Sequence, residues 1–267
     1  MEFNIPSKGV LKQGCEKLPD FVHTGNTLVN IRGTNGSGKT YTAREIASHF
    51  PFLSRKSIEV EGDGGRKQIV TYYDHGNFYM IGSYENDCGG LDTVRMFETI
   101  APLALKLLEE KSVLMEGLLW SSVFSSMHKL EHACRAAGHQ VVWCGFDYPV
   151  ETMINRVVER RVKQGNTKPL PIKNLLQKVK PVCSGLNHAI YFGSNVLIGD
   201  SDFLQAHVIQ ILENNDISGM PFKKEYYTIS DYDVWKERLD SDEEYSVSPG
   251  AELVAASRST NSLLDLL

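Results

Sequence analysis

The segment from residue 27 to residue 40 constrains the fold of this chain more than any other part of the sequence. Gly33 to Thr40 read G-x-x-x-x-G-K-T, where glycines permit backbone angles that let successive N–H groups surround phosphate oxygens. In this pattern Lys39 lies against the β- and γ-phosphates of a nucleotide, and the hydroxyl of Thr40 ligates Mg²⁺. The sequence therefore predicts a phosphate-binding loop (P-loop) made of Gly33, Thr34, Asn35, Gly36, Ser37, Gly38, Lys39 and Thr40.

The residues on either side of the loop have the character that this interpretation requires. Leu28, Val29 and Ile31 form a short apolar run that is typical of a buried strand, and residues 41–50 suit a helix. The N-terminus of that helix would add partial positive charge to the anion site. The alternative is a glycine-rich turn that contains a lysine by chance. We disfavour it because strand, loop and helix follow in the required order.

Composition limits the class of protein and points to an uneven charge. The 267 residues are 42% hydrophobic with a net charge of −5, which is enough apolar content for a substantial core. Five cysteines without a C-x-x-C pair indicate free thiols in a reducing cytosol. The N-terminus lacks a signal-like segment, and no apolar run is long enough for a membrane span. We therefore expect a cytoplasmic protein with no membrane partner.

Strands and helices alternate along most of the chain. Strands are predicted at 57–61, 68–73, 78–81, 113–115, 141–146 and 195–199, and helices from Val94 to about Lys111 and at 122–137, 149–162, 173–179 and 203–212. This order predicts an α/β fold of three layers with a parallel central sheet, into which the strands after residue 57 insert as an antiparallel β-hairpin.

The last fifty residues differ from the rest. Residues 1–215 are predicted to form the main domain and residues 216–267 a C-terminal extension. From residue 225 onward there are ten acidic residues against three basic ones, and residues 241–267 look flexible. Residues 222–235 contain three tyrosines and a tryptophan, and we expect them to pack on the domain.

Glu116 is the first candidate beyond the P-loop. It ends an apolar strand and precedes a glycine. A carboxylate at this place can hold the hydration shell of Mg²⁺ or polarise the attacking nucleophile. The alternative is a solvent-facing glutamate at the end of a strand. A lone acid here, where many motor ATPases have an Asp-Glu pair, favours a kinase.

Asp92 is the second candidate, at the mouth of the glycine loop formed by residues 88–93. Loops beyond strand ends build the ligand crevice of an α/β sheet, so Asp92 can serve as general base toward an acceptor hydroxyl. Equally, Asp92 or Thr93 can cap the helix that follows. Glu116, Asp74 and Asp87 are weaker candidates for the same base.

A basic segment follows the predicted strand at 141–146. Between residues 156 and 180 there are eight Lys or Arg and one acid. Arg156 and Arg160 fall on one helical face, and with Arg161 they are expected to form a lid over the phosphates, where they neutralise charge in the transition state. The alternatives are a solvated basic helix end that suits the helix dipole and, for the lysines, a surface that binds a nucleic-acid backbone.

Two smaller features have alternative interpretations. His128, His132 and Cys134 have part of a zinc-site spacing, but the cysteine points elsewhere on a helix, so a surface helix is the preferred interpretation. Among the tyrosines near the β-hairpin, most are expected to fill strand positions. Tyr84 is the exception, because it precedes the glycine loop and is a candidate for stacking on a base.

Three motifs together resemble the phage-type P-loop kinases that act on 5-hydroxymethyluracil in DNA. They are Gly33–Thr40, the Ile81-Gly82-Ser83-Tyr84 run before Cys88-Gly89-Gly90-Leu91-Asp92-Thr93, and Leu114-Met115-Glu116-Gly117-Leu118-Leu119. The resemblance covers about residues 27–212 and implies a thymidylate-kinase-like core in the host cytoplasm. It implies transfer of the γ-phosphate of ATP to the hydroxymethyl group of a modified pyrimidine in DNA. Lys39 and Thr40 would bind ATP and Mg²⁺, Asp92 and Glu116 would serve the acceptor and the metal, and the arginines would form the lid.

Two other activities remain open at this point. A kinase for a free nucleoside or nucleotide uses the same parts, although the basic segment favours a polymeric substrate. A non-kinase P-loop ATPase of the transporter or DNA-repair type would need a Ser-Gly-Gly signature and a strand that ends in Asp-Glu, and neither is present. A GTPase would need Asn-Lys-x-Asp, which is also missing, so ATP is the expected donor. The sequence gives no indication of oligomeric state.

Overall fold

A seven-stranded sheet forms the centre of the molecule in the computed structural model, which describes Leu18 and residues 22–61, 67–85, 89–94, 97–166, 168–241 and 246–247. The strand order is β2-β3-β4-β5-β1-β6-β8. The strands are β1 (Thr27–Arg32), β2 (Ser54–Glu61), β3 (Lys67–Asp74), β4 (Phe78–Ile81), β5 (Ser112–Glu116), β6 (Gln140–Phe146) and β8 (Asn195–Gly199). From β4 to β8 all neighbours are parallel, whereas β2, β3 and β4 pair antiparallel. The predicted parallel sheet with an antiparallel insertion is confirmed.

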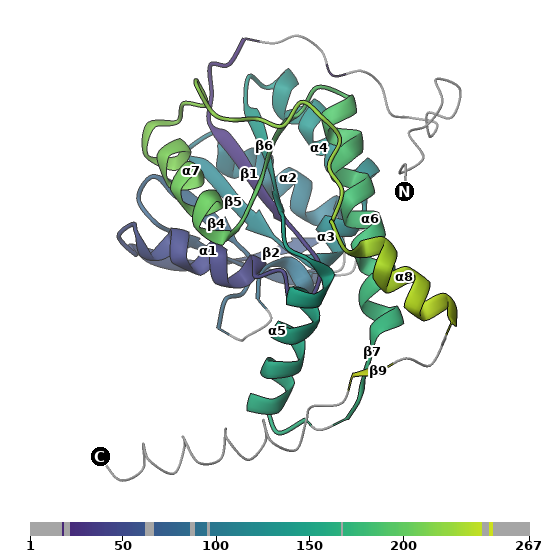
Figure 1. The fold of residues 1–267 in the computed structure, drawn as a ribbon. Helices are drawn as coiled ribbons and strands as arrows, with labels where there is room; N and C mark the ends of the chain where they lie inside the picture. Colours follow the sequence, from purple (N-terminus) through teal and green to yellow (C-terminus); the bar gives the residue numbers. More distant parts are fainter. Residues whose placement is uncertain are drawn as a thin grey trace.

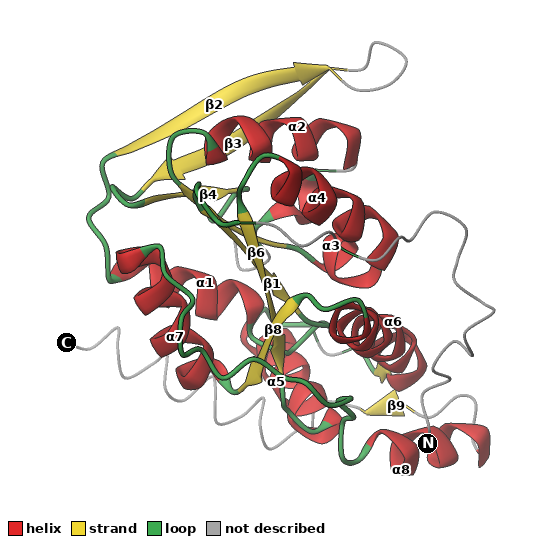
Figure 2. Ribbon diagram, turned by 90° about the horizontal axis from the view of Figure 1, so that it is seen from above, coloured by secondary structure: helices red, strands yellow, loops and turns green. Residues whose placement is uncertain are grey.

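Helices cover both faces of the sheet, which gives the predicted three layers (Figures 1 and 2). One face carries α1 (Lys39–Ser48) and α7 (Ser201–Asn214), and the other carries α2 (Phe97–Leu108), α4 (Phe124–Ala136) and α6 (Ile172–Tyr191). Successive side chains of a strand point to opposite faces. In β1, therefore, Leu28 packs with the second group of helices while Val29 and Ile31 pack with the first.

Further elements follow the carboxyl ends of β4, β5 and β6. The glycine loop after β4 leads into a 3₁₀ turn, η1 (Leu91–Thr93), and β5 leads into α3 (Leu118–Ser122). After β6 comes α5 (Val150–Lys163), and the short strands β7 (Leu170–Pro171) and β9 (Ser246–Val247) pair antiparallel. Of the described helices, none is both long and apolar enough to cross a membrane.

Three helices differ from the prediction. The segment predicted as a helix at 173–179 is the start of α6, which continues for 20 residues through Pro181. Pro181 removes one backbone hydrogen bond from the helix. Burial of the apolar face, which includes Leu175, Val182 and Leu186, stabilises the helix by more than this loss costs. The helix predicted from Val94 begins at residue 97, after η1. The helix predicted at 122–137 is α4, but the short helix α3 before it was not predicted, and Val123, which is extended, separates the two.

The first part of the C-terminal extension packs on the core, as expected. Tyr227, Ile229, Tyr232 and Trp235 are buried in the same apolar cluster as the inner face of α6, and residues Tyr232–Ser241 form α8. Residues 248–267, which belong to the segment predicted to be flexible, lie outside the described residues.

Candidate active site

The loop that joins β1 to α1 has the backbone conformation that its sequence predicts. Gly36 and Gly38 adopt positive φ angles of 78° and 93°, which favour glycine. At Gly36 a Cβ atom would lie 2.3 Å from the carbonyl oxygen of Met153. The loop therefore packs directly against the first turns of α5, and Gly36 permits this contact.

Lys39 is the first residue of α1 and turns back over the loop. Its Nζ donates a hydrogen bond to the carbonyl oxygen of Thr34 at 3.1 Å, and the Ser37 hydroxyl donates to the same oxygen at 2.9 Å. Gly33 and Ser37 are buried beneath the loop, while Asn35 is exposed. The ammonium group of Lys39 is thus held against the loop by its hydrogen bond to Thr34.

Glu116 lies beside the P-loop, and it is not the solvent-facing glutamate of the alternative interpretation. It is fully buried at the end of β5, and its Oε1 accepts a hydrogen bond of 2.9 Å from the Thr40 hydroxyl. Its Oε2 is buried and has no hydrogen-bond partner among the described residues. Burial raises the pKa of Glu116 to about 7, although the charge of Lys39 and the hydrogen bond from Thr40 act in the opposite direction.

This pair has the donor set that Mg²⁺ prefers. Hydroxyl and carboxylate oxygens are hard ligands, and Mg²⁺ usually keeps several waters and takes one or two carboxylates together with substrate phosphates. The buried Oε2 of Glu116 is an oxygen without a hydrogen-bond partner in the described part of the protein. No group of three or more His, Cys, Asp or Glu side chains that could hold a metal ion occurs within that part. The arrangement therefore fits a metal bound jointly with a nucleotide and does not need a cage of protein ligands.

The second glycine loop packs on this carboxylate. Gly90 has a φ of 72°, and a Cβ atom there would lie 2.3 Å from Oε1 of Glu116. Gly89 sits against the methyl group of Thr40, where the corresponding distance is 3.0 Å. Ser83 and Gly90 exchange two backbone hydrogen bonds, of 3.0 and 2.7 Å, which close the loop. The two glycine loops recognised in the sequence thus meet at Thr40 and Glu116.

Asp92 lies at the cleft but caps a different helix from the one expected. It belongs to η1, and its Oδ1 accepts a hydrogen bond from the backbone N–H of Leu118, the first residue of α3. The predicted cap on the next helix in sequence, α2, is not formed by this carboxylate, because α2 begins five residues later, at Phe97. A carboxylate suits the positive end of α3. Asp92 is therefore fixed by a contact between segments 26 residues apart.

A cleft of about 690 Å³ lies between α1, α5 and the P-loop. Besides six P-loop residues it is lined by Tyr41, Arg44, Glu45, Asp92, Arg156, Glu159, Arg160, Lys163 and Gln164. The guanidinium of Arg156 lies 4.0 Å from the ring centre of Tyr148, in a cation–π contact that directs it along the cleft wall. Arg161 points elsewhere and donates to the carbonyl oxygen of Lys168 at 3.1 Å. Of the three arginines predicted for the lid, two line the cleft.

Arg44 is a cleft residue that the sequence interpretation missed. It lies one helical turn after Thr40 on α1 and donates a hydrogen bond of 2.6 Å to the carbonyl oxygen of Tyr84. The spacing from Thr40 to Arg44 was the available signal, because residues four apart share one face of a helix. Arg44 connects α1 to the loop that carries Gly89 and Gly90, and its charge faces the cleft.

The prediction that Tyr84 stacks on a base is wrong. Its side chain is buried in the core, with its ring edge-on to Tyr73 at 6.0 Å between centres. The exposed tyrosine at the cleft is Tyr41, which is 59% exposed. The prediction of a surface helix for the His128 segment is also wrong in part, because His128 and Cys134 on α4 point into the core. In both cases the neighbouring elements, which a local pattern does not reveal, determine burial.

The fold and the site define a class of protein. A P-loop, a carboxylate on the adjacent parallel strand that accepts a hydrogen bond from the P-loop threonine, and arginines from the helix after β6 are the parts of a phosphotransferase. The chain is a P-loop phosphotransferase.

Comparison with known proteins identifies the family. No family model matches the chain. It is 30% identical to the "5-hmdU DNA kinase" of Pseudomonas phage PaMx11 over 192 residues, which cover 70% of this chain and 97% of that protein. It is 29% identical to the protein of the same name from Delftia phage PhiW-14 over 203 residues, 72% and 74% of the two chains. A third relative, from Pseudomonas phage M6, is 25% identical over 176 residues, 63% of this chain and 88% of that protein. The chain belongs to the family of phage 5-hmdU DNA kinases.

Proposed function

We propose that this kinase transfers the γ-phosphate of ATP to the hydroxymethyl group of 5-hydroxymethyluracil in DNA. The observation that carries the proposal is the contact between Thr40 and Glu116, with one buried carboxylate oxygen left without a partner among the described residues. This is the arrangement that a nucleotide-bound Mg²⁺ completes. The names of the phage relatives support the acceptor. The absence of a guanine motif supports ATP as the donor.

The protein's own residues divide the work of the reaction. Lys39 and the backbone N–H groups of the P-loop would bind the β- and γ-phosphates, and Arg156 and Arg160 would neutralise charge on the transferred group from the opposite wall. Thr40 and Glu116 would hold Mg²⁺, which supplies further charge neutralisation when it is bound. Because the transition state of phosphoryl transfer is stabilised mainly by position and charge, this set of groups is sufficient for the donor side.

Asp92 is the proposed general base toward the acceptor hydroxyl. One of its oxygens is used by the N–H of Leu118, and the residue lines the cleft beside the P-loop. The fixed oxygen orients the carboxylate, so that the second oxygen can take the proton as the hydroxymethyl oxygen bonds to the γ-phosphorus and the bond from that phosphorus to ADP breaks. A carboxylate held in place by a backbone N–H has little freedom to lose when the substrate binds. The reaction is proposed to take place in the host cytoplasm.

The proposal is tested by giving the protein labelled ATP and Mg²⁺ with one of two acceptors, DNA that contains 5-hydroxymethyluracil or the corresponding free nucleotide. Label is expected on the DNA alone, and Lys39→Ala should reduce transfer by at least 100-fold because a phosphate contact of the transition state is lost. Label only on the mononucleotide would show that the acceptor is the free nucleotide and not DNA. ATP hydrolysis that is independent of either acceptor would refute the kinase assignment for this site.

A further inference from the structure

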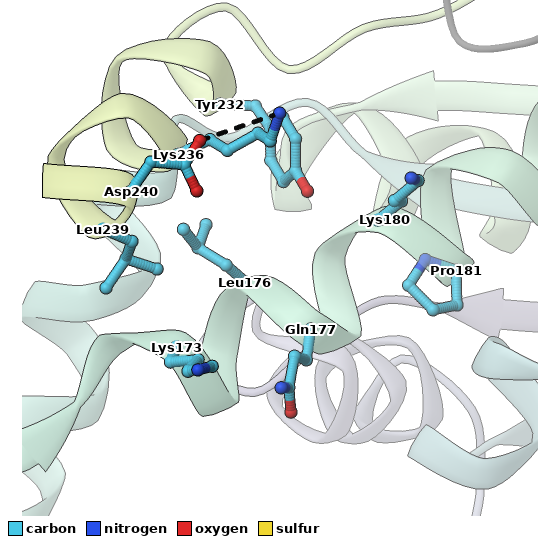
Figure 3. Close-up of a pocket in the computed structure, with 9 residues that line it drawn as sticks. All are labelled: Lys173, Leu176, Gln177, Lys180, Pro181, Tyr232, Lys236, Leu239 and Asp240. Atoms are coloured by element: carbon cyan, nitrogen blue, oxygen red, sulfur yellow. Dashed lines mark ion pairs between the residues drawn. The ribbon is translucent and has the colours of Figure 1, made fainter. Parts of the chain in front are cut away.

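A second groove lies away from the P-loop, between α6 and α8. Its volume is about 350 Å³, and it is lined by Lys173, Leu176, Gln177, Lys180, Pro181, Tyr232, Lys236, Leu239 and Asp240. Figure 3 shows α6 along one side and α8 along the other, with Leu176 and Leu239 between them. The groove therefore has an apolar floor and polar side chains around it, and the C-terminal extension forms one of its two walls.

The charge of this groove is opposite to that of the chain. Three lysines and one acid line it, whereas the whole chain has a net charge of −5. The acid, Asp240, lies 3.9 Å from Lys236 on the same helix and is 70% exposed. Lys180 has no ion-pair partner among the described residues, and its side chain belongs to the exposed face of α6. The groove thus has excess positive charge, and that excess comes from the two lysines on α6, since Lys236 and Asp240 on α8 have opposite charges.

Helix electrostatics do not account for these lysines. Cations stabilise the C-terminal end of a helix and destabilise its N-terminal end. Lys173 is the second residue of α6, and Lys180 is in its N-terminal half, with no acid in the first turn. Seven residues separate them, so they lie on one face about 10 Å apart along the axis. Lys173 is thus disfavoured by the helix dipole, and Lys180 lies beyond the first turn, where the dipole has little effect. Two cations on one face of the helix, lining one groove, fit an anionic partner that follows the helix.

The groove is connected to the active-site cleft by the chain itself. Arg156, Arg160 and Lys163 on α5 line the cleft, and α5 packs against α6. The link between these helices, residues 164–171, includes Lys168. Cationic residues therefore occur along the chain from the helix that lines the cleft, through this link, to the helix that lines the groove. A small nucleotide bound at the P-loop would leave the groove empty, whereas a polymeric substrate could occupy the cleft and the groove together.

We propose that the α6–α8 groove binds the phosphate backbone of the DNA acceptor beside its target base. The proposal rests on the proposed function, because it assumes a DNA acceptor. Duplex DNA carries a phosphate about every 1.7 Å of its axis, and binding by Lys releases condensed counterions. Lys173, Lys180 and Lys236 would each take one phosphate in this way. They would add affinity without reading sequence, as backbone contacts do.

The test measures binding separately from catalysis. DNA that contains 5-hydroxymethyluracil is titrated with the full-length protein by fluorescence anisotropy at several salt concentrations, for the wild type and for a Lys173→Gln, Lys180→Gln double variant. Loss of two phosphate contacts should reduce the slope of log K against log salt by about 2 and weaken binding roughly 50-fold at 0.1 M salt. ATP affinity should stay the same, because neither lysine lines the cleft. The matched control is Lys67→Gln, Lys106→Gln, two exposed lysines on β3 and α2, with no expected change.

Each other outcome is informative. An unchanged slope in the groove variant, an equal loss in the control variant, or no binding of DNA by the wild type would overturn the groove as a DNA site. A groove variant with the expected loss, combined with a wild type that binds DNA but transfers no phosphate to it, would support the groove and refute the proposed reaction. Normal phosphate transfer at limiting DNA by the groove variant would refute the groove alone.

Discussion

At the scale of single residues, the buried carboxylate of Glu116 lowers the stability of the folded protein when it is charged. A carboxyl group in the core is disfavoured in its charged form, and burial accordingly raises the pKa of Glu116 to about 7. The folded protein therefore holds the proton more tightly than the unfolded chain, where the group has its ordinary value of 4.5. The stability contributed by the protonated form is fully present below pH 4.5 and is lost as the pH rises through about 7.

A Glu116→Gln variant should separate the two roles of this residue. The amide stays neutral at every pH, so in metal-free buffer the variant should be more stable than the wild type by up to about 3 kcal/mol at pH 8, and close to it at pH 4.5. Urea unfolding at the two pH values, with a chelator present, measures this difference. Phosphate transfer at saturating Mg²⁺ should fall by at least 100-fold, because the amide is a weaker metal ligand.

The control for this experiment is Glu109→Gln, on an exposed glutamate, which should change the free energy of unfolding by less than about 0.5 kcal/mol. If the stability difference between Glu116→Gln and the wild type does not vary with pH, the carboxylate is not desolvated as the structure indicates.

How far single residues could be predicted depends on whether their partners are local. Lys39 and Thr40 follow from one loop pattern, and Glu116 from the end of the apolar strand before Gly117. The contact of Asp92 with Leu118 could not be predicted in the same way. It joins η1, which lies between β4 and β5, to α3, which follows β5. No spacing in the sequence relates a carboxylate to a backbone N–H in another element.

At the scale of elements, the five-residue helix α3 connects the parts of the site. The N–H of its first residue donates a hydrogen bond to Asp92. Near its end, the Ser121 hydroxyl donates to the carbonyl oxygen of Gly117 at 2.6 Å and accepts from the N–H of Gly33 at 3.1 Å. Arg32, the last residue of β1, donates to the carbonyl oxygen of Ser121 at 2.5 Å. α3 thus couples the first residue of the P-loop to the residue after Glu116.

Arg32 is an unusual group to use for this purpose. It is fully buried with its guanidinium 4.6 Å from the ring centre of Trp143, and burial lowers its pKa to about 9. No acidic side chain pairs with it in the described part of the protein, and its Nε and Nη1 have no hydrogen-bond partner there. A buried charge of this kind costs several kcal/mol. An apolar residue would be expected at this position if only stability mattered.

Arg32→Met and Arg135→Met should therefore have opposite effects. Arg32→Met removes a costly buried charge but also the hydrogen bond to Ser121 and the contact with Trp143, so these opposing effects should leave the free energy of unfolding little changed. ATP affinity should fall about tenfold or more, because Ser121 no longer fixes Gly33. Arg135 forms an ion pair of 2.9 Å with the buried Glu131, away from the P-loop. Its loss leaves Glu131 without that cation and should cost about 3–5 kcal/mol of stability with little change in ATP affinity. Urea unfolding and calorimetric titration with ATP measure both quantities.

The opposite pattern, with Arg32→Met strongly destabilised and its residual folded fraction binding ATP normally, would make Arg32 a residue of the core alone.

Elements were predictable where periodicity is strong. The strands β1, β5, β6 and β8 agree with the prediction to within one or two residues, because each is a short apolar run between turn residues. α6 was predicted too short because Pro181 and Gly185 are ordinarily helix breakers. In this helix the apolar face continues through both residues. Tertiary packing of that face therefore outweighs the low helix propensity of the two residues, and local propensity alone does not reveal this.

At the scale of the whole molecule, the extension contacts β6, α6 and α5, and α5 lines the cleft. The hydroxyl of Tyr227 donates a hydrogen bond to the carbonyl oxygen of Phe146 at 2.5 Å. The backbone N–H and carbonyl oxygen of Tyr227 each form a hydrogen bond of 2.8 Å with the side chain of Asn187 on α6. Asp231 accepts hydrogen bonds from the N–H groups of Val150 and Glu151, at 2.7 and 3.0 Å. The first turn of α5, the helix of Arg156 and Arg160, is thus capped by a residue about 80 positions later in the chain.

The aromatic content of residues 222–235 was enough to predict that they pack on the domain, because burial of large side chains is the main favourable term. The cap on α5 was not predictable, since Pro149 occupies the position where a capping side chain is usually found. That Asp231 supplies the cap follows only from the three-dimensional arrangement of α5 and α8.

Asp231→Ala should accordingly affect the active site from a distance. Loss of an N-terminal cap costs about 1 kcal/mol, and here the same carboxylate also accepts a hydrogen bond of 3.1 Å from the indole N–H of Trp235 on α8. We expect faster hydrogen exchange in the first turn of α5 and a several-fold lower affinity for ATP. The matched control is Asp200→Ala, which removes the cap of α7, where Asp200 accepts from the N–H of Phe203 at 2.8 Å. Because α7 does not line the cleft, the control should lose similar stability and keep its ATP affinity. Equal effects of the two variants on ATP affinity would mean that the extension stabilises the fold without organising the site.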